Sequence, residues 1–143
     1  MKLAELIAQK QSPSITVAAT ASVAEAIRIM NDNYIGSVII PSDKGTPLGI
    51  ITERDVMRLC AQGKGGSLDQ LSVQDCMTTN VVCGSPEDTL DDALNLMTQR
   101  RFRRLPIVAD NTLLGLLSIG DLVKAKLEET VQEAQALREY IAS

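Results

Sequence analysis

The sequence predicts an α/β fold built from two copies of one β-α-β-β-α unit, packed together as a single pseudo-twofold module. The first observation is an internal repeat, because "GIITERD" (49–55) returns as "GLLSIGD" (115–121). The second is that the surroundings also match, with "SVAEAIRIM" (22–30) answered by "TLDDALNLM" (89–97). The third is the alternation of short apolar runs with segments of helical periodicity, which indicates layered strands and helices. One copy alone would bury too little apolar surface to be stable, so both copies are expected to fold together.

Each copy contains three predicted strands, which are short β-branched or apolar runs bounded by residues typical of turns. In chain order they are "ITV", "SVII" and "LGII" in the first copy, and "VVC", "LPIV" and "LLGLL" in the second. The turns "SDKGTP" and "ADN" separate the second predicted strand of each copy from the third.

Each copy also contains two predicted helices, and a hydroxyl residue stands at the N-cap of every one. These N-caps are Ser22, Thr52, Thr89 and Ser118. A carboxylate follows three residues after each cap, as in a capping box. Behind the first cap of each copy, apolar residues recur at helical spacing: Val23, Ile27 and Met30, then Leu90, Leu94 and Met97.

The repeat boundaries predict a first domain at residues 8–62, a glycine-rich linker at 63–73 and a second domain at 74–130. A helix over 122–143 is expected to continue past the repeat. Apolar or small residues follow a four-three spacing there, at Val123, Leu127, Thr130, Ala134, Leu137 and Ile141. Two alternatives remain open for this helix: it packs against its own module, or it forms a contact in a dimer.

The composition argues against several classes of function. The 143 residues are 45% hydrophobic with no Trp, one Phe and two Tyr, so stacking of single-stranded nucleic acid is not expected. The net charge of −4 argues against binding to phosphate backbones. No apolar run is long enough to span a membrane, and the start "MKLAELIAQK" lacks the features of a signal peptide. Cys60, Cys76 and Cys83 form an odd set without C-x-x-C spacing, so we expect reduced, buried thiols in a cytoplasmic protein.

The sequence offers no recognisable catalytic constellation. It contains no His, no metal-ligand spacing, and neither a G-x-G-x-x-G nor a P-loop lysine motif. We therefore expect a protein that is not an enzyme and that requires no metal.

The repeated glycine-to-aspartate stretch has two interpretations. In the structural one, Thr52 with Asp55, and Ser118 with Asp121, are capping boxes. In the ligand interpretation, the preceding glycine lets a ligand approach the strand, and the hydroxyl and the helix N-terminus hold a phosphate. The carboxylate would then accept hydrogen bonds from ribose hydroxyls. A ligand that contains both a phosphate and a ribose is a nucleotide.

The chain resembles a tandem pair of CBS domains, also called a Bateman module. The two glycine-to-aspartate stretches, "IGSVII", "RFRRLPIV" and "CMTTNVVCGSPEDTL" carry this resemblance, which covers nearly the whole chain. It implies a non-catalytic regulatory module that binds an adenosine-containing ligand in clefts between the two domains. AMP and NAD are the ligands most expected, with ADP and ATP as further possibilities, and the module would signal energy or redox state to an effector protein. The alternative is an interaction or dimerisation scaffold with vestigial clefts. Homodimers are common in the family, so a homodimer is also expected.

The resemblance also implies a set of binding residues. Ribose hydroxyls would be bound by Asp55 and Asp121, and phosphate by Thr52 and Ser118. The adenine would meet Ser14, Ile15, Thr79 and Val81. The walls of the clefts would be completed by Ile35, Gly36, Ser37, Phe102, Arg103 and Arg104, and the set also includes Arg54 and Pro106.

Two departures from the family pattern bear on the ligand. Many relatives have His where Arg104 stands, and an arginine keeps its positive charge at every pH and binds phosphate bidentately. The first copy has Gly36 and Ser37 where the second has Arg103 and Arg104, so the two clefts are not expected to be equivalent.

The basic cluster "QRRFRR" (99–104) has three interpretations: a solvated turn, a nucleic-acid patch, which the acidic remainder disfavours, or a phosphate clamp.

Overall fold

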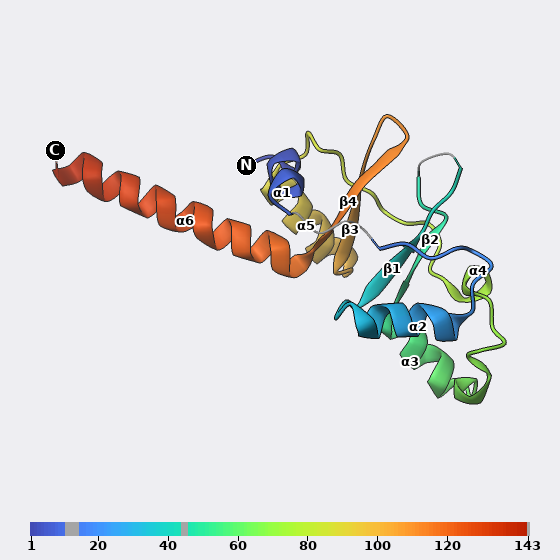
Figure 1. The fold of residues 1–143 in the computed structure, drawn as a ribbon. Helices are drawn as coiled ribbons and strands as arrows, with labels where there is room; N and C mark the ends of the chain where they lie inside the picture. Colours follow the sequence, from blue (N-terminus) through green and yellow to red (C-terminus); the bar gives the residue numbers. More distant parts are fainter. Residues whose placement is uncertain (11–14, 44–45, 143) are drawn as a thin grey trace. The chain divides into compact units, whose positions relative to one another are not determined.

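The computed structural model describes residues 1–10, 15–43 and 46–142, and the chain divides into two compact units (Figure 1). Unit 1 consists of Met1–Ser12, Cys83–Ala109 and Leu114–Ser143. Unit 2 consists of Pro13–Val82 and Asp110–Leu113. The N-terminal segment therefore groups with the second repeat rather than with the first.

Unit 2 is built around a two-stranded antiparallel sheet. β1 (Ser37–Ile40) pairs with β2 (Gly49–Thr52), so that Ser37 lies opposite Thr52 and Ile40 opposite Gly49. Helices α2 (Val23–Asp32) and α3 (Glu53–Ala61) contribute their apolar faces to the core around this sheet. That core is aliphatic, as the composition predicts; its buried members are Val17, Val23, Ala26, Met30, Val38, Ile40, Ile51, Leu59 and Val73.

The segment that follows the linker also packs in unit 2. After a short 3₁₀ helix, η1 (Gly65–Ser67), the chain enters the one-turn helix α4 (Val73–Cys76). Ser72 forms an antiparallel bridge with Ser22, and Thr78 forms one with Ile50. The residues that open the second copy in the sequence thus lie against the first copy in space.

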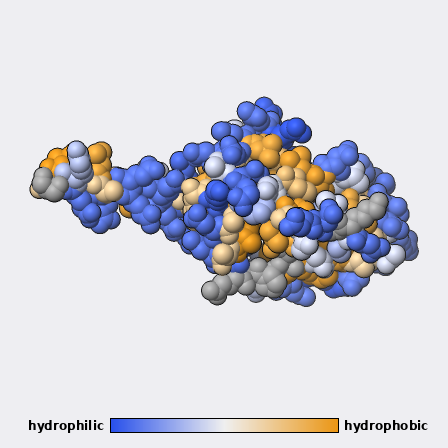
Figure 2. Space-filling view, turned by 90° about the horizontal axis from the view of Figure 1, so that it is seen from above, coloured by the Kyte–Doolittle hydropathy of each residue, from blue (hydrophilic) through white to orange (hydrophobic). Residues whose placement is uncertain are grey.

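Unit 1 contains α1 (Leu3–Gln9), α5 (Leu90–Arg100), β3 (Arg104–Ala109), β4 (Thr112–Ser118) from Leu114 onward, and α6 (Ile119–Ala142). The free end of α6 projects beyond the other elements of its unit and carries apolar side chains (Figures 1 and 2). Only the start of α6 is packed, through Leu122 and Ala125. The second half of α6 therefore does not pack against the other elements of its own unit.

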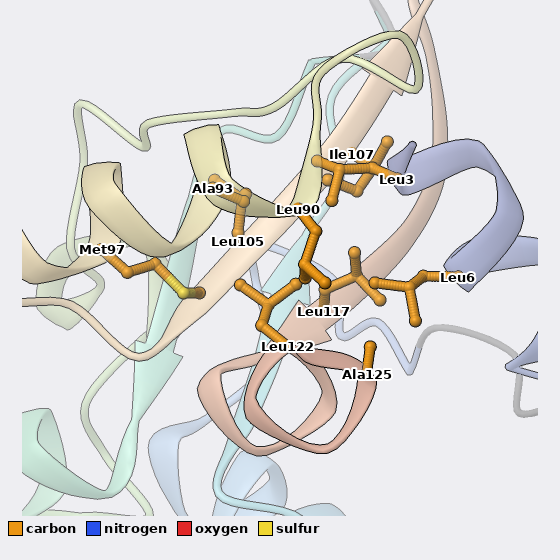
Figure 3. Packing of buried hydrophobic residues seen from close by; sticks show 10 residues of the cluster. All are labelled: Leu3, Leu6, Leu90, Ala93, Met97, Leu105, Ile107, Leu117, Leu122 and Ala125. Carbon is orange, nitrogen blue, oxygen red and sulfur yellow. The ribbon is translucent and has the colours of Figure 1, made fainter. Parts of the chain in front are cut away.

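The core of unit 1 lies between the N-terminal helix α1 and the helices and strands of the second repeat (Figure 3). Leu3 and Leu6 of α1 insert between α5, the strands and the first turns of α6. Backbone hydrogen bonds fix this position: the N–H of Leu3 donates to the carbonyl of Asp88, and that of Leu90 to the carbonyl of Met1, both at 2.9 Å. The buried members are Leu3, Leu6, Leu90, Ala93, Met97, Leu105, Ile107, Leu117, Leu122 and Ala125.

The predicted turn between the last two strands of the second copy is confirmed. β3 and β4 are neighbours in a two-stranded sheet, and Asp110 and Asn111 connect them. Both residues have positive φ, 50° and 58°, which is the signature of a type I′ hairpin turn. Asp and Asn tolerate this conformation better than other residues with a side chain.

All four predicted N-caps are confirmed. Ser22 accepts a hydrogen bond from the N–H of Glu25, and Thr89 forms a full capping box with Asp92. Thr52 and Ser118 likewise cap α3 and α6. The sequence therefore locates the first residue of each of these helices correctly.

The first predicted strand of each copy is not a full strand. Thr16 forms an isolated parallel bridge with Ile39, and Gly84, which follows "VVC", forms one with Ile107. In unit 1 a longer ladder is prevented in part by Pro106, which accepts from the N–H of Gly84 but has no N–H to donate. These segments are extended connections that touch the middle strands at one point.

No helix within the described ranges combines the length and apolar character that a membrane span requires.

Candidate functional site

In unit 2, the repeated motif forms the junction between β2 and α3. Thr52 ends the strand and caps the helix, and the N–H of Asp55 donates to its Oγ1 at 3.3 Å. In return Oδ2 of Asp55 accepts from the N–H of Thr52 at 2.9 Å and from its hydroxyl at 3.1 Å. The N–H of Glu53, at the first helical position, donates to the carbonyl of Gly36. Two N–H groups of the first turn therefore already have internal acceptors.

The carboxylate of Asp55 is buried, with 3% of the residue exposed, and both of its oxygens accept hydrogen bonds. Besides the two bonds from Thr52, Oδ1 accepts from the hydroxyl of Thr78 at 2.9 Å and from Nη1 of Arg58 at 3.3 Å. An ionised carboxylate offers about four lone-pair positions, so these four donors account for its capacity. A ribose hydroxyl would have to replace one of them.

The glycine that precedes this motif is explained by the chain itself. A Cβ on Gly49 would lie 2.5 Å from Sδ of Met77 and 2.8 Å from the carbonyl oxygen of Thr78. That carbonyl accepts from the N–H of Ile50, and the N–H of Thr78 donates back to the carbonyl of Ile50. The partner that approaches the strand at this glycine is thus the segment 77–78, and no ligand is needed to explain it.

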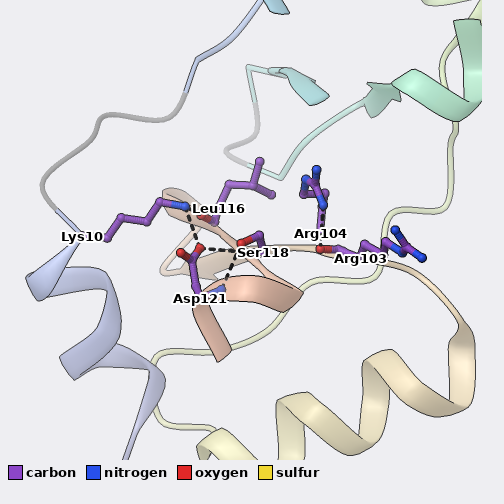
Figure 4. Close-up of polar contacts among 6 residues, drawn as sticks. All are labelled: Lys10, Arg103, Arg104, Leu116, Ser118 and Asp121. Carbon is purple, nitrogen blue, oxygen red and sulfur yellow. Dashed lines mark hydrogen bonds and ion pairs between the residues drawn. The ribbon is translucent and has the colours of Figure 1, made fainter. Parts of the chain in front are cut away.

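In unit 1, the same motif forms the junction between β4 and α6, with a different set of partners (Figure 4). Oδ2 of Asp121 accepts from the N–H of Ser118 at 2.8 Å, and the N–H of Asp121 donates to Oγ of Ser118 at 3.1 Å. Lys10, just beyond α1, supplies the other contact: its Nζ lies 2.8 Å from Oδ2 of Asp121 and 2.8 Å from the carbonyl oxygen of Leu116. The N–H of Ile119 donates to the carbonyl of Arg103, which matches the bond from Glu53 to Gly36.

Asp121 is the more accessible of the two carboxylates. Its side chain is 32% exposed, and within the ranges that the structure describes no hydrogen bond reaches its Oδ1. Burial alone would raise the pKa of Asp121, but hydrogen bonds from Lys10 and Ser118, together with the charge of Lys10, outweigh burial and lower that pKa. The group is therefore an anion at neutral pH, with one oxygen available to a further donor.

The basic residues lie on the other side of this junction from Lys10 (Figure 4). Nη1 of Arg104 donates to the carbonyl of Arg103 at 3.2 Å, and both side chains point away from Asp121. Arg103 is exposed, Arg104 and Phe102 are half-buried, and Pro106 is buried within β3. The structure thus brings two guanidinium groups to the same end of unit 1 as Ser118 and Asp121, without a contact between them.

The other predicted site residues divide between the two units. Ser37 is buried opposite Thr52, and Gly36 and Ile35 precede it, so these three lie beside the start of α3. Arg54 and Thr79 are exposed, whereas Ile15 and Val81 are half-buried. Ser14 lies outside the described residues.

Lys10, Thr78 and Arg58 contact the repeated carboxylates, and the sequence analysis missed all three. Lys10 and Thr78 come from segments distant in sequence, so no local pattern at either motif indicates them. The repeat itself carries a signal, because Lys10 precedes the first copy at about the place where Met77 and Thr78 precede the second. That comparison relates the two segments to each other, but it does not show that each segment contacts the aspartate of the other copy.

Neither metal nor thiol chemistry is evident at these junctions. No group of three or more potential ligands that could hold a metal ion occurs among the described residues. All three cysteines lie in described segments, and none forms a disulfide. Burial raises the pKa of the Cys76 and Cys83 thiols, which keeps them protonated at neutral pH. Cys60 is exposed, and Cys76 and Cys83 are half-buried, so the expectation of three buried thiols is wrong.

Comparison with known proteins agrees with the repeat and with the fold. A CBS domain family model matches residues 6–62 and again 73–128. The chain is 38% identical over 108 residues to the CBS domain-containing protein YhcV of Bacillus subtilis, which covers 75% of this chain and 74% of that protein.

Solved structures give the same result. The crystal structure of a CBS-domain-containing protein from Agrobacterium tumefaciens superposes with a TM-score of 0.81 and 36% identity, covering 88% of this chain and 99% of the other. A CBS domain protein of Pyrobaculum aerophilum, solved in complex with AMP, has the same fold, with a TM-score of 0.73 and 24% identity over 85% of this chain and 89% of that one. With both repeats matched by the family model, this chain belongs to the CBS domain family and contains two CBS domains in tandem.

Proposed function

We propose that the chain is a non-catalytic regulatory module that binds an adenine nucleotide and reports it to an effector protein. The observation that carries this proposal is the arrangement of Asp121: an ionised, partly exposed carboxylate at the start of α6, with one oxygen unbonded among the described residues. Vicinal ribose hydroxyls are suitable donors to such an oxygen.

The surroundings of Asp121 also suit a phosphate. Ser118 provides a hydroxyl at the helix N-terminus, where the N–H groups and the helix dipole favour an anion. Gly120 occupies the second helical position, is exposed, and has no side chain to cover its N–H. Arg103 and Arg104 carry permanent positive charge at the same end of the unit, which favours the phosphate-clamp interpretation of the basic cluster.

Support for adenine comes from the AMP complex of the Pyrobaculum relative, whose fold this chain shares. We propose AMP or NAD as the ligand, with ATP and ADP as further candidates, because all four present adenine, ribose and phosphate. A change in the adenylate or NAD pool would then change the occupancy of the module. No metal is required in this proposal, because the fixed positive charges are arginines.

We propose that the motif in unit 2 binds the nucleotide more weakly than the motif in unit 1. Asp55 already accepts four hydrogen bonds, so a ribose hydroxyl would first have to displace a donor such as the Thr78 hydroxyl. A module working in the cytoplasm fits this function, because its ligands are abundant there and its thiols are not paired in disulfides. We also propose that the module acts as a homodimer, because α6 leaves large apolar side chains exposed.

Isothermal titration calorimetry of the intact chain with AMP, ATP and NAD tests the proposal, with GMP as the control. We expect saturable binding of at least one adenine ligand and none of GMP. A ligand at a hundred times its dissociation constant should add about 2.7 kcal/mol to the free energy of unfolding. Flat titrations with all adenine ligands at millimolar concentration would reject nucleotide binding. They would favour the second candidate, an interaction scaffold, for which the exposed face of α6 is the specific observation.

A further inference from the structure

Helix α6 presents an apolar stripe that nothing in its own unit covers. From Leu127 onward the side chains of α6 are exposed, apart from the partly covered Glu129. Three large apolar side chains of the stripe are mostly exposed: Leu127 at 63%, Leu137 at 58% and Ile141 at 73%. Figure 2 shows apolar surface on the free end of this helix. Isolated helices of about 15 residues are marginal in water, so a helix extending this far from its unit needs a partner.

The stripe has the spacing of a coiled-coil seam. If Leu127 is placed at heptad position a, then Ala134 and Ile141 also occupy a positions. The d positions are then Val123, Thr130 and Leu137. Large side chains therefore stand at both ends of the seam, and small ones stand in the middle, where two helices can approach closely.

The charges beside the seam fit a parallel pair of identical helices. With Leu127 at a, Glu133 is at position g and Arg138 is at the following position e. In a parallel, in-register pair, g of one helix lies beside the following e of the other, so Glu133 meets Arg138 of the second copy twice by symmetry. Within one helix these two residues are five positions apart and lie off the i,i+3 and i,i+4 spacings.

An antiparallel pair with the same apolar contacts loses this complementarity. The a and d positions can still be matched, Leu127 with Leu137 and Thr130 with Ala134. The flanking positions then place Glu133 beside its own copy and Lys124 beside Arg138, and both pairs are repulsive. The charge pattern thus selects the parallel arrangement.

We propose that α6 is an interaction surface for a second copy of this chain, and that the two helices form a short, parallel, in-register coiled coil. The inference rests on the proposed homodimer and deepens it by naming its interface and orientation. Because the seam is short and its middle positions carry only the small residues Thr130 and Ala134, the dimer is expected to dissociate on dilution. The two modules of a dimer would then extend from the same end of the coiled coil.

Sedimentation equilibrium of the intact chain, from about 1 to 100 µM, tests the interface, because this range brackets micromolar dissociation constants. We expect a concentration-dependent monomer–dimer equilibrium for the parent. Leu137→Glu places two carboxylates in the apolar seam and should raise the dissociation constant at least tenfold, about 1.4 kcal/mol. Gln135→Glu adds the same charge at an exposed position away from the seam and should leave the constant within about twofold. Both positions are exposed, so the packed core of unit 1 should be unchanged in both variants, and circular dichroism should show a loss of helix confined to the free half of α6 in Leu137→Glu.

Charge exchange tests the orientation. Arg138→Glu should weaken a parallel dimer, because it opposes Glu133 of the second copy, whereas it should strengthen an antiparallel dimer by facing Lys124. The double variant Glu133→Arg/Arg138→Glu should restore the parallel dimer. A dimer that persists unchanged in Leu137→Glu would overturn this interface while leaving the homodimer intact. A monomer at every concentration would overturn both, and neither result would bear on nucleotide binding.

Discussion

Replacing the two repeated aspartates one at a time separates a ligand contact from a helix cap. Asp121→Ala should weaken nucleotide binding strongly, whereas Asp55→Ala should mainly destabilise the fold. The reason is the difference in their surroundings: Asp55 is buried and accepts four hydrogen bonds, whereas Asp121 is one-third exposed and has one oxygen unbonded within the described residues.

The cost in stability follows from these contacts. Removing Asp55 loses a capping box, about 1 kcal/mol, and the hydrogen bond from the Thr78 hydroxyl, about another 1 kcal/mol. Arg58 is 56% exposed, so its ion pair adds little. Asp121→Ala loses a similar capping box and a half-exposed pair with Lys10, for a total of about 1–1.5 kcal/mol. Urea unfolding without ligand measures both values.

The effect on affinity should run in the opposite order. If Asp121 binds ribose hydroxyls, its removal leaves them unpaired in a partly buried site, at a cost of about 1–3 kcal/mol. That corresponds to a loss of about five- to a hundredfold in affinity, which calorimetry resolves. Asp55→Ala should change affinity by less than about twofold, well under 1 kcal/mol.

Asp92→Ala is the matched control for the loss of a cap. Asp92 forms a capping box with Thr89 at the start of α5, in the same unit as Asp121 and with the same two backbone contacts. It should reduce stability by about 1 kcal/mol without changing nucleotide affinity. If Asp121→Ala binds as tightly as Asp92→Ala, Asp121 is only a cap. Equal losses of affinity in Asp55→Ala and Asp121→Ala would refute the inequivalence of the two motifs.

Two further predictions follow from single contacts. Lys10→Met should raise the pKa of Asp121, because it removes the hydrogen bond and the positive charge that lower this pKa against the effect of burial. A lowered pKa stabilises the folded state at pH values above the ordinary aspartate pKa of about 3.9, and this stabilisation is lost as the pH falls through the folded-state pKa. The variant has less of this stabilisation, so its acid unfolding should begin at a higher pH. An NMR titration of the Asp121 carboxyl group checks this, and an unchanged curve would show that Lys10 does not set the pKa. Gly49→Ala should cost about 1–3 kcal/mol, since its Cβ would lie 2.8 Å from a backbone oxygen held in a bridge. Gly66→Ala, with nothing within 4 Å, should be neutral or stabilising, and equal losses in the two variants would contradict the close contact.

Local features of the fold could be predicted from the sequence because they depend on neighbouring residues. The N-caps, the hairpin turn at Asp110–Asn111 and the aliphatic core all follow from local chemistry and periodicity. Contacts between distant segments could not be predicted in this way. α1 packs in the unit of the second repeat, the segment after the linker packs on the first repeat, and the contacts of Lys10 and Thr78 arise from these exchanges. The different exposure of the two aspartates is likewise a property of what packs over them, since each aspartate stands at the same position of the motif, three residues after its hydroxyl cap.

The repeated motif also shows why a helix cap and a ligand contact are not exclusive alternatives. A capping box engages only part of a carboxylate, and the remaining lone pairs are free to accept from another partner. In the first copy, the remaining acceptor positions of Asp55 are taken by Thr78 and Arg58, from the chain itself. In the second copy, Lys10 joins the cap on Oδ2, and its positive charge keeps the group ionised without occupying Oδ1. The same local chemistry thus completes the structure in one repeat and leaves an acceptor for a nucleotide in the other, so the segments that pack from outside each copy decide which role the aspartate has.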